Sequence, residues 1–462
     1  MNRRELLKSI GISVGGTIIS TKVLARLSDN SFEYSIPPNP LHKPIGKPVT
    51  AITLGAGNRG TVYGNFSAEF PKELKIVGVA EPIKYRNDTY AKTHKIADEN
   101  RFTTWEHVFN RPKFADAIII TTPDRLHYGP CMKALEMGYD VLLEKPISPS
   151  EKECRNILEL SKKKGRIVAV CHVLRYAPYF VKMKELIAKG TVGEVISVQH
   201  FEPIEHTHMA HSYVRGNWHN SKETTPIILS KSCHDLDIIK WLINKPSKQI
   251  VAMGDLKWFK IQNAPEGSTP RCTDGCKVER QCPYSAIRNY YDKRERINVF
   301  DLPEDKSKHA EVIMVRLKTT NYGRCVYRME NDQPDHYITS IQFGDNVTAN
   351  FSMEAFTSYE GRRTRIMGAM GDMVGDMTEL VITDFRTGKQ TKLVPKAEDV
   401  EGYKNSGHGG GDWLLVRDFV QAVAQQNAQL LTSTIDDSIE SHVMGFMAEE
   451  SRKKGKVMQI KM

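Results

Sequence analysis

The fold is decided by one stretch, VTAITLGAGNRG at residues 49–60. A short apolar, β-branched run leads into a glycine turn, and a helical pattern follows it. Gly55, Gly57 and Gly60 fit the spacing G-x-G-x-x-G. In that motif the first glycine makes a tight turn, the second lets the backbone approach a pyrophosphate, and the third lets the helix pack on the strand. The stretch therefore predicts a dinucleotide-binding turn at the N-terminus of a helix.

An acidic residue after the next strand indicates which dinucleotide is bound. Residues 74–80 (LKIVGVA) are typical of a strand, and Glu81 follows them. A carboxylate about 20 positions beyond the glycines can bind the adenosine ribose, which favours NAD. Arg86 lies close by in the sequence and is able to meet a 2′-phosphate instead, so NADP stays open. Asn58 and Arg59 complete the expected phosphate-binding turn, and a glycine turn without a ligand is the alternative.

The third predicted strand ends in polar residues that we expect at the cofactor. Residues 114–120 form a buried apolar run that leads into Thr121, Thr122 and Pro123, with His127 shortly after. In open parallel sheets, ligands bind at the carboxyl ends of the strands. These four residues are therefore predicted to border the cofactor.

The fourth predicted strand, residues 139–143, delivers Glu144, Lys145 and Pro146. A lysine at this edge of the sheet lies beside the nicotinamide and can hydrogen-bond a substrate hydroxyl. In a partly desolvated cleft it can also act as an acid or base. We therefore expect Glu144 and Lys145 at the cofactor, with Lys145 also a catalytic and substrate-binding residue. A surface Glu-Lys-Pro turn is the alternative.

A second candidate for proton transfer lies in ILSKSCHDLD, residues 228–237. His234 is favoured because the unperturbed pKa of histidine lies nearest neutrality. Lys231 precedes it by three positions, and a continuous helix would place both side chains on one face. The alternative is a structural histidine that is held by Asp235 or Asp237.

The order of these motifs resembles that of the Gfo/Idh/MocA oxidoreductases, the relatives of glucose–fructose oxidoreductase and inositol dehydrogenase. The glycine turn, the Thr-Thr-Pro…His segment, Glu-Lys-Pro and the later Arg-Tyr-Ala-Pro at residues 175–178 follow that order. The resemblance covers most of the chain from about residue 49 on. It implies an α/β fold: an N-terminal Rossmann dinucleotide-binding domain, then an α+β domain with a large open, mostly antiparallel sheet. It also implies Arg175 near the cofactor, Tyr176 near the substrate, and action on sugars or polyols.

One departure from the family concerns the proton relay. Many of its dehydrogenases carry an aspartate four residues before the histidine that corresponds to His234, and here that position is Ser230. A serine cannot accept a proton as a carboxylate does. The relay is therefore open, and Lys231 is added as a catalytic and substrate-binding candidate.

We divide the chain into an export signal (1–25), an extended lead-in (26–48), a Rossmann NAD(P)-binding domain (49–170) and a substrate and oligomerisation domain (171–462). Strands of the second domain are expected at residues 310–318, 324–330, 337–343 and 347–356, among others. Trp218 and His219 in a polar loop, and His408 in a glycine-rich loop, are predicted to reach the substrate. The resemblance implies a homo-oligomer formed through the open sheet.

Three cysteines lie close together, Cys272, Cys276 and Cys282. Zinc prefers four ligands, and Cys325 or His309 is a candidate fourth. The spacing is not that of a standard zinc ribbon and lacks the full ferredoxin pattern. A disulfide is equally possible if the protein is exported. A structural zinc site, a disulfide and a plain structural role therefore all stay open.

The composition excludes some classes of protein. The chain of 462 residues is long enough for two domains, and its 40% hydrophobic and 26% charged residues are typical of a soluble globular protein. The formal charge is +10. No basic run is interleaved with aromatic residues, which argues against a nucleic-acid partner.

The N-terminus resembles a twin-arginine export signal. Arg3 and Arg4 precede an apolar segment at residues 10–20 that is too short to span a membrane. We therefore expect a periplasmic or exported protein without a membrane span. The alternative is an ordinary basic N-terminal helix on a cytoplasmic protein.

Three functions are compatible with these patterns. The first is an NAD(P)-dependent oxidoreductase that transfers hydride between nicotinamide and a hydroxyl or carbonyl carbon of a sugar, polyol or glycoside. The second is a glycoside hydrolase that uses the same cofactor transiently: it oxidises the sugar, eliminates the glycosidic bond, adds water and reduces the product again. The intact Glu-Lys-Pro argues against it, because the glycosidase branch that resembles this family tends to lose the lysine. The third is a non-enzymatic sugar-binding protein, which only Ser230 favours.

Overall fold

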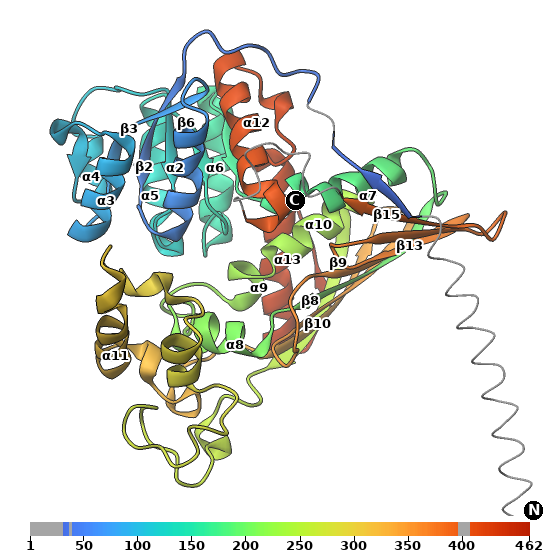
Figure 1. Ribbon diagram of the computed structural model, residues 1–462. Helices are drawn as coiled ribbons and strands as arrows, with labels where there is room; N and C mark the ends of the chain where they lie inside the picture. Colours follow the sequence, from blue (N-terminus) through green and yellow to red (C-terminus); the bar gives the residue numbers. More distant parts are fainter. Residues whose placement is uncertain (1–30, 37–38, 396–406) are drawn as a thin grey trace, which may run out of the picture.

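The computed structural model describes residues 31–36, 39–395 and 407–462. Figure 1 shows two lobes joined side by side, each built on one sheet, and a third group of short helices below the first lobe. The twin-arginine-like segment lies outside the described residues. Within them, no helix is both long and apolar enough to cross a membrane.

The first lobe is a parallel six-stranded sheet with helices on its faces. Its strand order is β4-β3-β2-β5-β6-β7, and every neighbouring pair is parallel. The strands are β2 (Val49–Leu54), β3 (Leu74–Ala80), β4 (Arg101–Phe102), β5 (Ala117–Ile120), β6 (Asp140–Leu143) and β7 (Val168–Val170). The helices are α2 (Asn58–Glu69), α3 (Lys84–His94), α4 (Trp105–Val108), α5 (Tyr128–Glu136) and α6 (Glu151–Lys164). The order reverses between β2 and β5, where such sheets bind their ligands.

The second lobe is a ten-stranded sheet in the order β1-β15-β14-β13-β12-β8-β11-β10-β9-β16. Only the pairs β1–β15 and β8–β11 are parallel among these described strands. The strands are β1 (Ser31–Tyr34), β8 (Val195–Pro203), β9 (Ser247–Asp255), β10 (His336–Phe343), β11 (Thr348–Glu354), β12 (Arg363–Gly368), β13 (Gly371–Gly375), β14 (Leu380–Asp384), β15 (Gln390–Pro395) and β16 (Met458–Gln459). The predicted fold class is confirmed, although β1, β9 and β15 were not predicted as strands.

One face of this second sheet is covered by helices and the other is open. The covering helices are α7 (Pro178–Ala188), α10 (Cys233–Ile243) and α13 (Ile435–Lys454), which share one apolar core with the sheet. On the open face, Ile196, Met253, Ile338 and Val374 have 43% to 61% of their surface exposed. The register places Ile338 directly opposite Met253. Val374, by contrast, is followed across the sheet by Arg365 and Gln199, so the open face carries exposed apolar side chains interspersed with polar ones.

Between β9 and β10, residues 256–335 leave the sheet and form a separate lobe, which we call the insert. It contains the π-helix η7 (Ile287–Asp292), the 3-10 turns η8 (Ile297–Phe300) and η11 (Val326–Arg328), and α11 (His309–Thr319). In Figure 1 it lies below the Rossmann sheet, where α11 is labelled. The strands predicted at 310–318 and 324–330 are wrong. Ile313 and Leu317, one helical turn apart, instead pack on Phe300 in a small local core.

The C-terminal part of the chain returns to the first lobe. Trp413 and Phe419 of α12 (Gly411–Gln425) join the core that covers β2 and α2, in contact with Ala51 and Phe66. Figure 1 shows α12 beside the Rossmann helices. The Rossmann layer is thus completed by a helix that lies far beyond residue 170 in the sequence.

Candidate active site

The glycine turn after β2 has the shape that a dinucleotide needs. Gly55 has φ +91°, and a Cβ there would lie 2.7 Å from the carbonyl oxygen of Thr121. A Cβ on Gly60 would lie 2.1 Å from the carbonyl oxygen of Gly55. At Gly57, by contrast, a Cβ would meet only Arg86, at 3.8 Å. Gly55 and Gly60 are therefore packed closely against neighbouring backbone, whereas the space beside Gly57 is open. This arrangement fits a pyrophosphate bound at the middle glycine.

Two predicted cofactor residues brace this turn. The hydroxyl of Thr121 donates to the carbonyl of Gly55 at 2.6 Å. The buried carboxylate of Glu81 accepts from the amides of Ala56 at 2.8 Å and Ile83 at 2.9 Å. Glu81 therefore holds the glycine turn through two backbone amides, a role that the sequence did not predict. Whether it also binds a ribose stays a prediction.

Arg59 in the first turn of α2 joins three parts of the chain. Its Nε donates to Glu144 at 2.6 Å, and its Nη2 donates to Asp412 at 2.8 Å. The hydroxyl of Tyr63 also donates to Glu144 at 2.8 Å. Arg59 thus ties the Glu-Lys-Pro turn and α12 to the glycine helix. Asp412, in the first turn of α12, is the partner that the sequence did not reveal.

The charges of this network hold the two carboxylates ionised. Burial alone would raise the pKa of Glu144, but the positive charges of Arg59 and Lys145 outweigh it and lower the pKa. Burial also acts to raise the pKa of Asp412, and Arg59 and His408 together bring it below its usual value. The site therefore carries two fixed negative charges next to the predicted catalytic lysine.

Lys145 lies where the two lobes meet. It follows β6 and precedes a cis peptide bond to Pro146. Its backbone amide donates to Glu144 at 2.6 Å, and its Nζ donates to the carbonyl oxygen of Ser230 at 2.7 Å. Because an ammonium group has three protons, Lys145 keeps the capacity to donate to a substrate oxygen. The backbone carbonyl at position 230, which any residue there would supply, thus positions the lysine, whereas the buried hydroxyl of Ser230 has no hydrogen-bond partner among the described residues.

His234 lies in the first turn of α10 and is 6% exposed. Its ring centroid is 5.8 Å from that of His172 and 5.9 Å from that of His408. Its Nδ1 has no hydrogen-bond partner in the described part of the chain. Burial, reinforced by the charge of Lys145, lowers the pKa of His234 well below its usual value. The imidazole is therefore neutral at neutral pH, and the same effects make it a weaker base than a free histidine.

His408 and His172 complete a group of histidines around this position. The glycine-rich loop brings His408 to His234, and the Nδ1 of His408 lies 3.1 Å from Asp412. His172 is fully buried, and neither of its ring nitrogens has a hydrogen-bond partner among the described residues. His172 was not among the predicted site residues. It lies two residues beyond the end of β7, as Lys145 lies two residues beyond the end of β6, so the rule that found Lys145 would have found it.

Lys231 is arranged differently from the prediction. A continuous helix through Lys231 and His234 is wrong, because α9 (Ile227–Ser230) ends before Lys231 and α10 begins at Cys233. The Nζ of Lys231 instead forms an ion pair with Glu202 of β8 at 2.9 Å. The catalytic role of Lys231 stays a prediction.

The neighbouring aspartates do not hold His234. Asp235 accepts from Arg362 at 2.7 Å and lies 3.0 Å from the Nε2 of His200. Asp237 receives two bonds from Arg175, at 2.7 and 2.6 Å. The alternative of a structural histidine fixed by either aspartate therefore finds no support in these contacts.

Arg175 and Tyr176 lie buried at the junction of the lobes. Besides its bidentate pair with Asp237, Arg175 donates to the carbonyl of Asp437 at 3.0 Å. The hydroxyl of Tyr176 accepts from the amide of Thr432 at 3.1 Å. Both side chains are thus committed to the C-terminal segment. Their predicted contacts with cofactor and substrate are not part of these bonds and stay predictions.

The other predicted residues link loops around the cleft. His127 lies between the carbonyl oxygens of Pro146 at 2.7 Å and Thr122 at 2.8 Å. The indole nitrogen of Trp218 donates to Asp124 at 3.1 Å, across the two lobes. These bonds connect the Thr-Thr-Pro turn to the Glu-Lys-Pro turn and to the second lobe. The ring of His219, next to Trp218, lies 2.8 Å from the carbonyl oxygen of Gly216.

Comparison with known proteins identifies the family. The description "oxidoreductase family, NAD-binding Rossmann fold" matches residues 50–172, and "oxidoreductase family, C-terminal alpha/beta domain" matches residues 184–460. The chain belongs to the Gfo/Idh/MocA oxidoreductase family. It is therefore an NAD-dependent oxidoreductase, and the alternative of a non-enzymatic sugar-binding protein is not supported.

Individual relatives of this oxidoreductase are distant. YteT of Bacillus subtilis, an oxidoreductase by name, is 26% identical over 66% of this chain and 71% of its own. An inositol 2-dehydrogenase/D-chiro-inositol 3-dehydrogenase of Lactiplantibacillus plantarum is also 26% identical, but the match spans 37% of this chain and about half (48%) of that protein.

Solved structures share the fold. Levoglucosan dehydrogenase in complex with NADH and levoglucosan has a TM-score of 0.66 at 15% identity, and the match covers 90% of this chain and 100% of that one. An inositol dehydrogenase homologue of Azotobacter vinelandii with NADH and myo-inositol has a TM-score of 0.64 at 14% identity, covering 91% and 99%. At these identities the likeness shows the fold alone.

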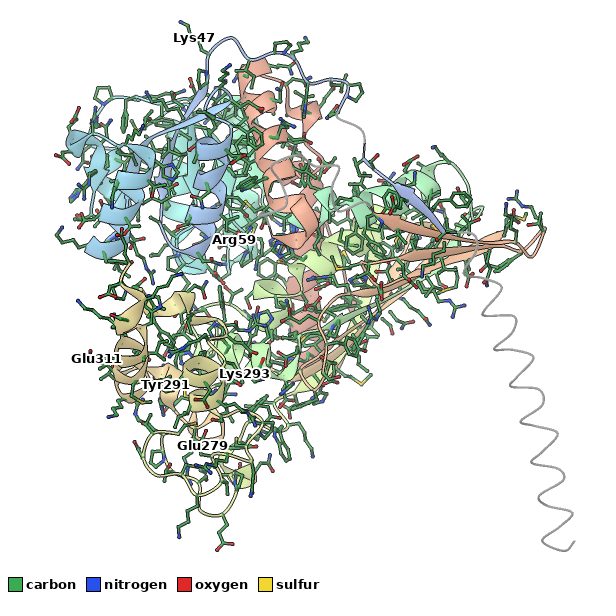
Figure 2. All side chains as sticks on the ribbon, in the orientation of Figure 1. Lys47, Arg59, Glu279, Tyr291, Lys293 and Glu311 are labelled. Atoms are coloured by element: carbon green, nitrogen blue, oxygen red, sulfur yellow. The ribbon has the colours of Figure 1, made fainter. Side chains whose placement is uncertain are left out.

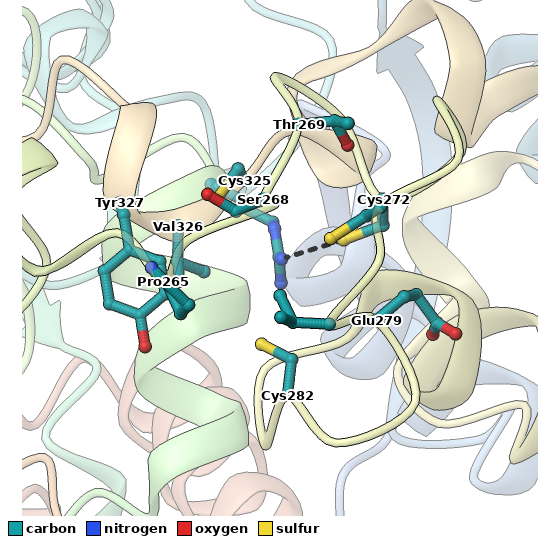
Figure 3. A pocket seen from close by; sticks show the side chains of 12 residues that line it. Pro265, Ser268, Thr269, Cys272, Glu279, Cys282, Cys325, Val326 and Tyr327 are labelled. Carbon is teal, nitrogen blue, oxygen red and sulfur yellow. Dashed lines mark hydrogen bonds between the residues drawn. The ribbon is translucent and has the colours of Figure 1, made fainter.

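The cysteines of the oxidoreductase line a small cavity in the insert, of about 20 Å³ (Figure 3). Cys272, Cys276, Cys282 and Cys325 all border it, as free thiols. An Nη2 of Arg215 lies 3.9 Å from the Sγ of Cys272, so a cation points at the thiols. Among the described residues, no group of three or more His, Cys, Asp or Glu side chains is arranged to hold a metal ion. The expected structural zinc is thus not supported, and no disulfide joins these four cysteines.

The buried histidines predict how the stability of the oxidoreductase depends on pH. Burial lowers the pKa of His172 and His234, and lowers that of His442 to about 3. In the unfolded chain each pKa is about 6.5. As the pH falls below about 6.5, the unfolded chain therefore binds protons that the folded protein does not, and the free energy of unfolding decreases. The expected slope is up to about 1.4 kcal/mol per pH unit for each histidine.

Urea denaturation between pH 8 and 5 measures this slope. His442→Gln keeps one acceptor for the amide of Ile147 and one donor for the carbonyl of Ser438, the two bonds that His442 makes. It should lessen the slope by the contribution of one histidine. His107→Gln, at an exposed position, is the control and should leave the slope unchanged. An unchanged slope in the His442 variant would contradict the assignment.

Proposed function

We propose that this oxidoreductase is a dehydrogenase that transfers a hydride between nicotinamide and a hydroxyl-bearing carbon of a sugar, polyol or glycoside. The observation that carries the proposal is the placement of Lys145 and His234 together at the carboxyl edge of the Rossmann sheet. The names of relatives and of structural neighbours, which include inositol and levoglucosan dehydrogenases, support this class of substrate.

The chemistry divides between the two residues. When bound, the nicotinamide supplies the hydride acceptor or donor. Lys145, held by the carbonyl of Ser230, donates a hydrogen bond to the reacting oxygen and fixes it in place. His234 is neutral, so it accepts the hydroxyl proton as the carbonyl forms and returns it in the reverse direction. His408 lies beside His234, with the two ring centroids 5.9 Å apart, and is itself held by Asp412, which lies 3.1 Å from its Nδ1.

Removing the lysine tests this assignment. Lys145→Ala should lower kcat/KM by about 10²-fold or more, because a positioned acid–base group contributes about 10²–10⁴-fold. Affinity for NADH, followed by fluorescence, should change little. Substrates are screened by NADH absorbance with myo-inositol, levoglucosan and a set of hexoses. Lys133→Ala on α5, whose ammonium group forms a half-exposed ion pair with Glu136, is the control and should behave as wild type.

The outcome also separates the glycosidase alternative. Near-wild-type turnover by Lys145→Ala would show that the proposed role of the lysine is wrong. Sugar release from a glycoside without net formation of NADH would instead support hydrolysis through transient oxidation. The intact Glu-Lys-Pro favours the dehydrogenase.

We further propose that the cofactor is NAD and not NADP, for a reason that lies in the insert. Arg86, which stands near the middle glycine of the turn, is paired with Asp301 through bonds of 2.7 and 3.2 Å. An arginine at this place can accommodate a 2′-phosphate only if its charge is available. Asp301 neutralises it, so a 2′-phosphate gains little from Arg86.

Asp301→Asn should therefore raise the use of NADP. We expect the ratio of kcat/KM for NADP to that for NAD to increase about tenfold, equivalent to about 1.4 kcal/mol. Glu304→Gln removes a carboxylate from the same segment, where it pairs with the exposed Lys92, and should leave the ratio unchanged. An unchanged ratio in Asp301→Asn would refute the assignment.

Assembly and location are proposed on separate grounds. The exposed apolar side chains of Ile196, Met253, Ile338 and Val374 favour a homo-oligomer through the open sheet. A monomeric mass by light scattering would contradict it. The twin-arginine-like segment favours export of the folded protein to the periplasm. Recovery of the protein with an intact N-terminus from the cytoplasmic fraction alone would contradict that.

A further inference from the structure

A groove of about 780 Å³ lies between α8 (His206–Met209), the insert and the loop that follows β11. It is lined from α8 by Glu205, His206 and Thr207, from the insert by residues that include Asn289 and Arg296, and from the loop by residues 358–360. Figure 2 labels Lys293, another lining residue, below Arg59 and the Rossmann sheet. The proposed reaction uses none of these side chains.

A buried polar atom in this groove has no partner. Asn289 is 6% exposed, and its Oδ1 has no hydrogen-bond partner in the part of the chain that the structure describes. Leaving a buried acceptor unpaired costs about 1–3 kcal/mol. Because Asn289 lines the groove, a rotation of its side-chain amide toward a bound ligand would let this acceptor receive a hydrogen bond and would remove the cost. Hydroxyl groups can donate such a bond.

The backbone around the groove is unusual on both sides. Glu205 has φ +77° and ψ 140°, which a residue with a Cβ rarely adopts, and its carboxylate caps α8 through the amides of Thr207 and His208. Asn289 lies on the π-helix η7. A second π-helix, η5 (Ala210–Arg215), packs against it, and a hydrogen bond of 2.8 Å joins the Nδ1 of His211 in η5 to the hydroxyl of Tyr290 in η7. Strained backbone and π-helices occur preferentially at functional sites.

The charges of the groove are balanced. The lining contains the carboxylates Glu205, Glu295 and Glu360, and the cations Arg288, Lys293 and Arg296. Arg296 pairs with Glu360, and Lys293 with Glu295 at 3.6 Å. A charged ligand therefore gains no net attraction. Tyr359, 43% exposed, offers an aromatic surface on which the apolar face of a sugar ring can rest.

The groove adjoins the reaction site through α8. His208 follows the lining residue Thr207 and forms a bond of 2.9 Å with the lining residue Glu360. Glu205, another lining residue, lies three residues after Glu202 of β8, which forms an ion pair with Lys231 at 2.9 Å. Lys231 directly follows Ser230, whose carbonyl holds Lys145. The groove is thus joined to the predicted catalytic lysine through the end of β8 and Lys231.

We propose that this groove binds a neutral glycosyl unit linked to the sugar that is oxidised, so that the substrate class is a di- or oligosaccharide. The inference rests on the proposed function. In this arrangement Asn289 accepts a hydroxyl of the glycosyl unit, and Tyr359 contacts its apolar face. The unit to be oxidised lies between Lys145 and His234.

The test uses the full-length protein with bound NAD and an array of neutral di- to hexasaccharides from glucans, mannans, xylans and galactans. We expect at least one oligosaccharide to bind, and calorimetry to give a Kd at least tenfold weaker for Tyr359→Ala and for Asn289→Ala. KM for the same oligosaccharide should rise at least tenfold, with kcat within twofold.

The exposed Tyr359 can be removed without disturbing the core, so this variant remains informative if Asn289→Ala does not fold. Tyr291→Ala, on the same π-helix but outside the groove lining, is the matched control and should bind as wild type (Figure 2).

The outcomes separate the two proposals. If no neutral oligosaccharide binds, or if the Tyr359 variant binds as tightly as wild type, the groove assignment is overturned. If monosaccharides or polyols are then still oxidised, the proposed dehydrogenase stands without it. If no sugar of any length produces NADH, the proposed function fails; binding on the array that depends on Tyr359 would still support the groove as a carbohydrate site.

Discussion

The buried ion pairs of Arg59 are the constraint on which the rest of the site depends. Its partners Glu144 and Asp412 have side chains that are 6% and 1% exposed. Two carboxylates this deeply buried would be strongly unfavourable without a cation between them. Because they come from the turn after β6 and from α12, satisfying their charges brings both segments to the glycine helix. Lys145, next in sequence to Glu144, is thereby fixed at the junction of the lobes.

This arrangement sets the division between charged and neutral groups. The fixed carboxylates, Glu144 and Asp412, pair with Arg59, whereas His172 and His408 lie around His234 in the first turn of α10. Burial and the charge of Lys145 keep His172 and His234 neutral, since a further positive charge there would be both desolvated and repelled. A lysine that donates and an imidazole that accepts therefore face the same space, which is what transfer of a hydroxyl proton requires.

Local sequence patterns predicted the parts of the site that depend on local structure. The glycine turn and Lys145 follow from a strand, a turn and a helix in order, and both lie as predicted. The patterns failed where distant contacts decide. Residues 310–318 are rich in β-branched and apolar side chains, yet they form a helix because Ile313 and Leu317 meet the small core of the insert. Asp412 could not be found from its neighbours, because its partner Arg59 is more than 350 residues away.

The insert is the part of the chain that the sequence predicted least, and it contacts the first lobe beside the glycine turn as well as lining the groove. At one end Asp301 holds Arg86 beside the glycine turn. At the other, Asn289 lines the groove that adjoins α8. Between these ends the insert is held together by its own apolar core, so the two contacts belong to one compact unit. Under the proposals above, a single insertion between β9 and β10 sets both the cofactor and the substrate that the Rossmann and sheet framework accepts, while Lys145 and His234, which lie outside it, carry out the chemistry.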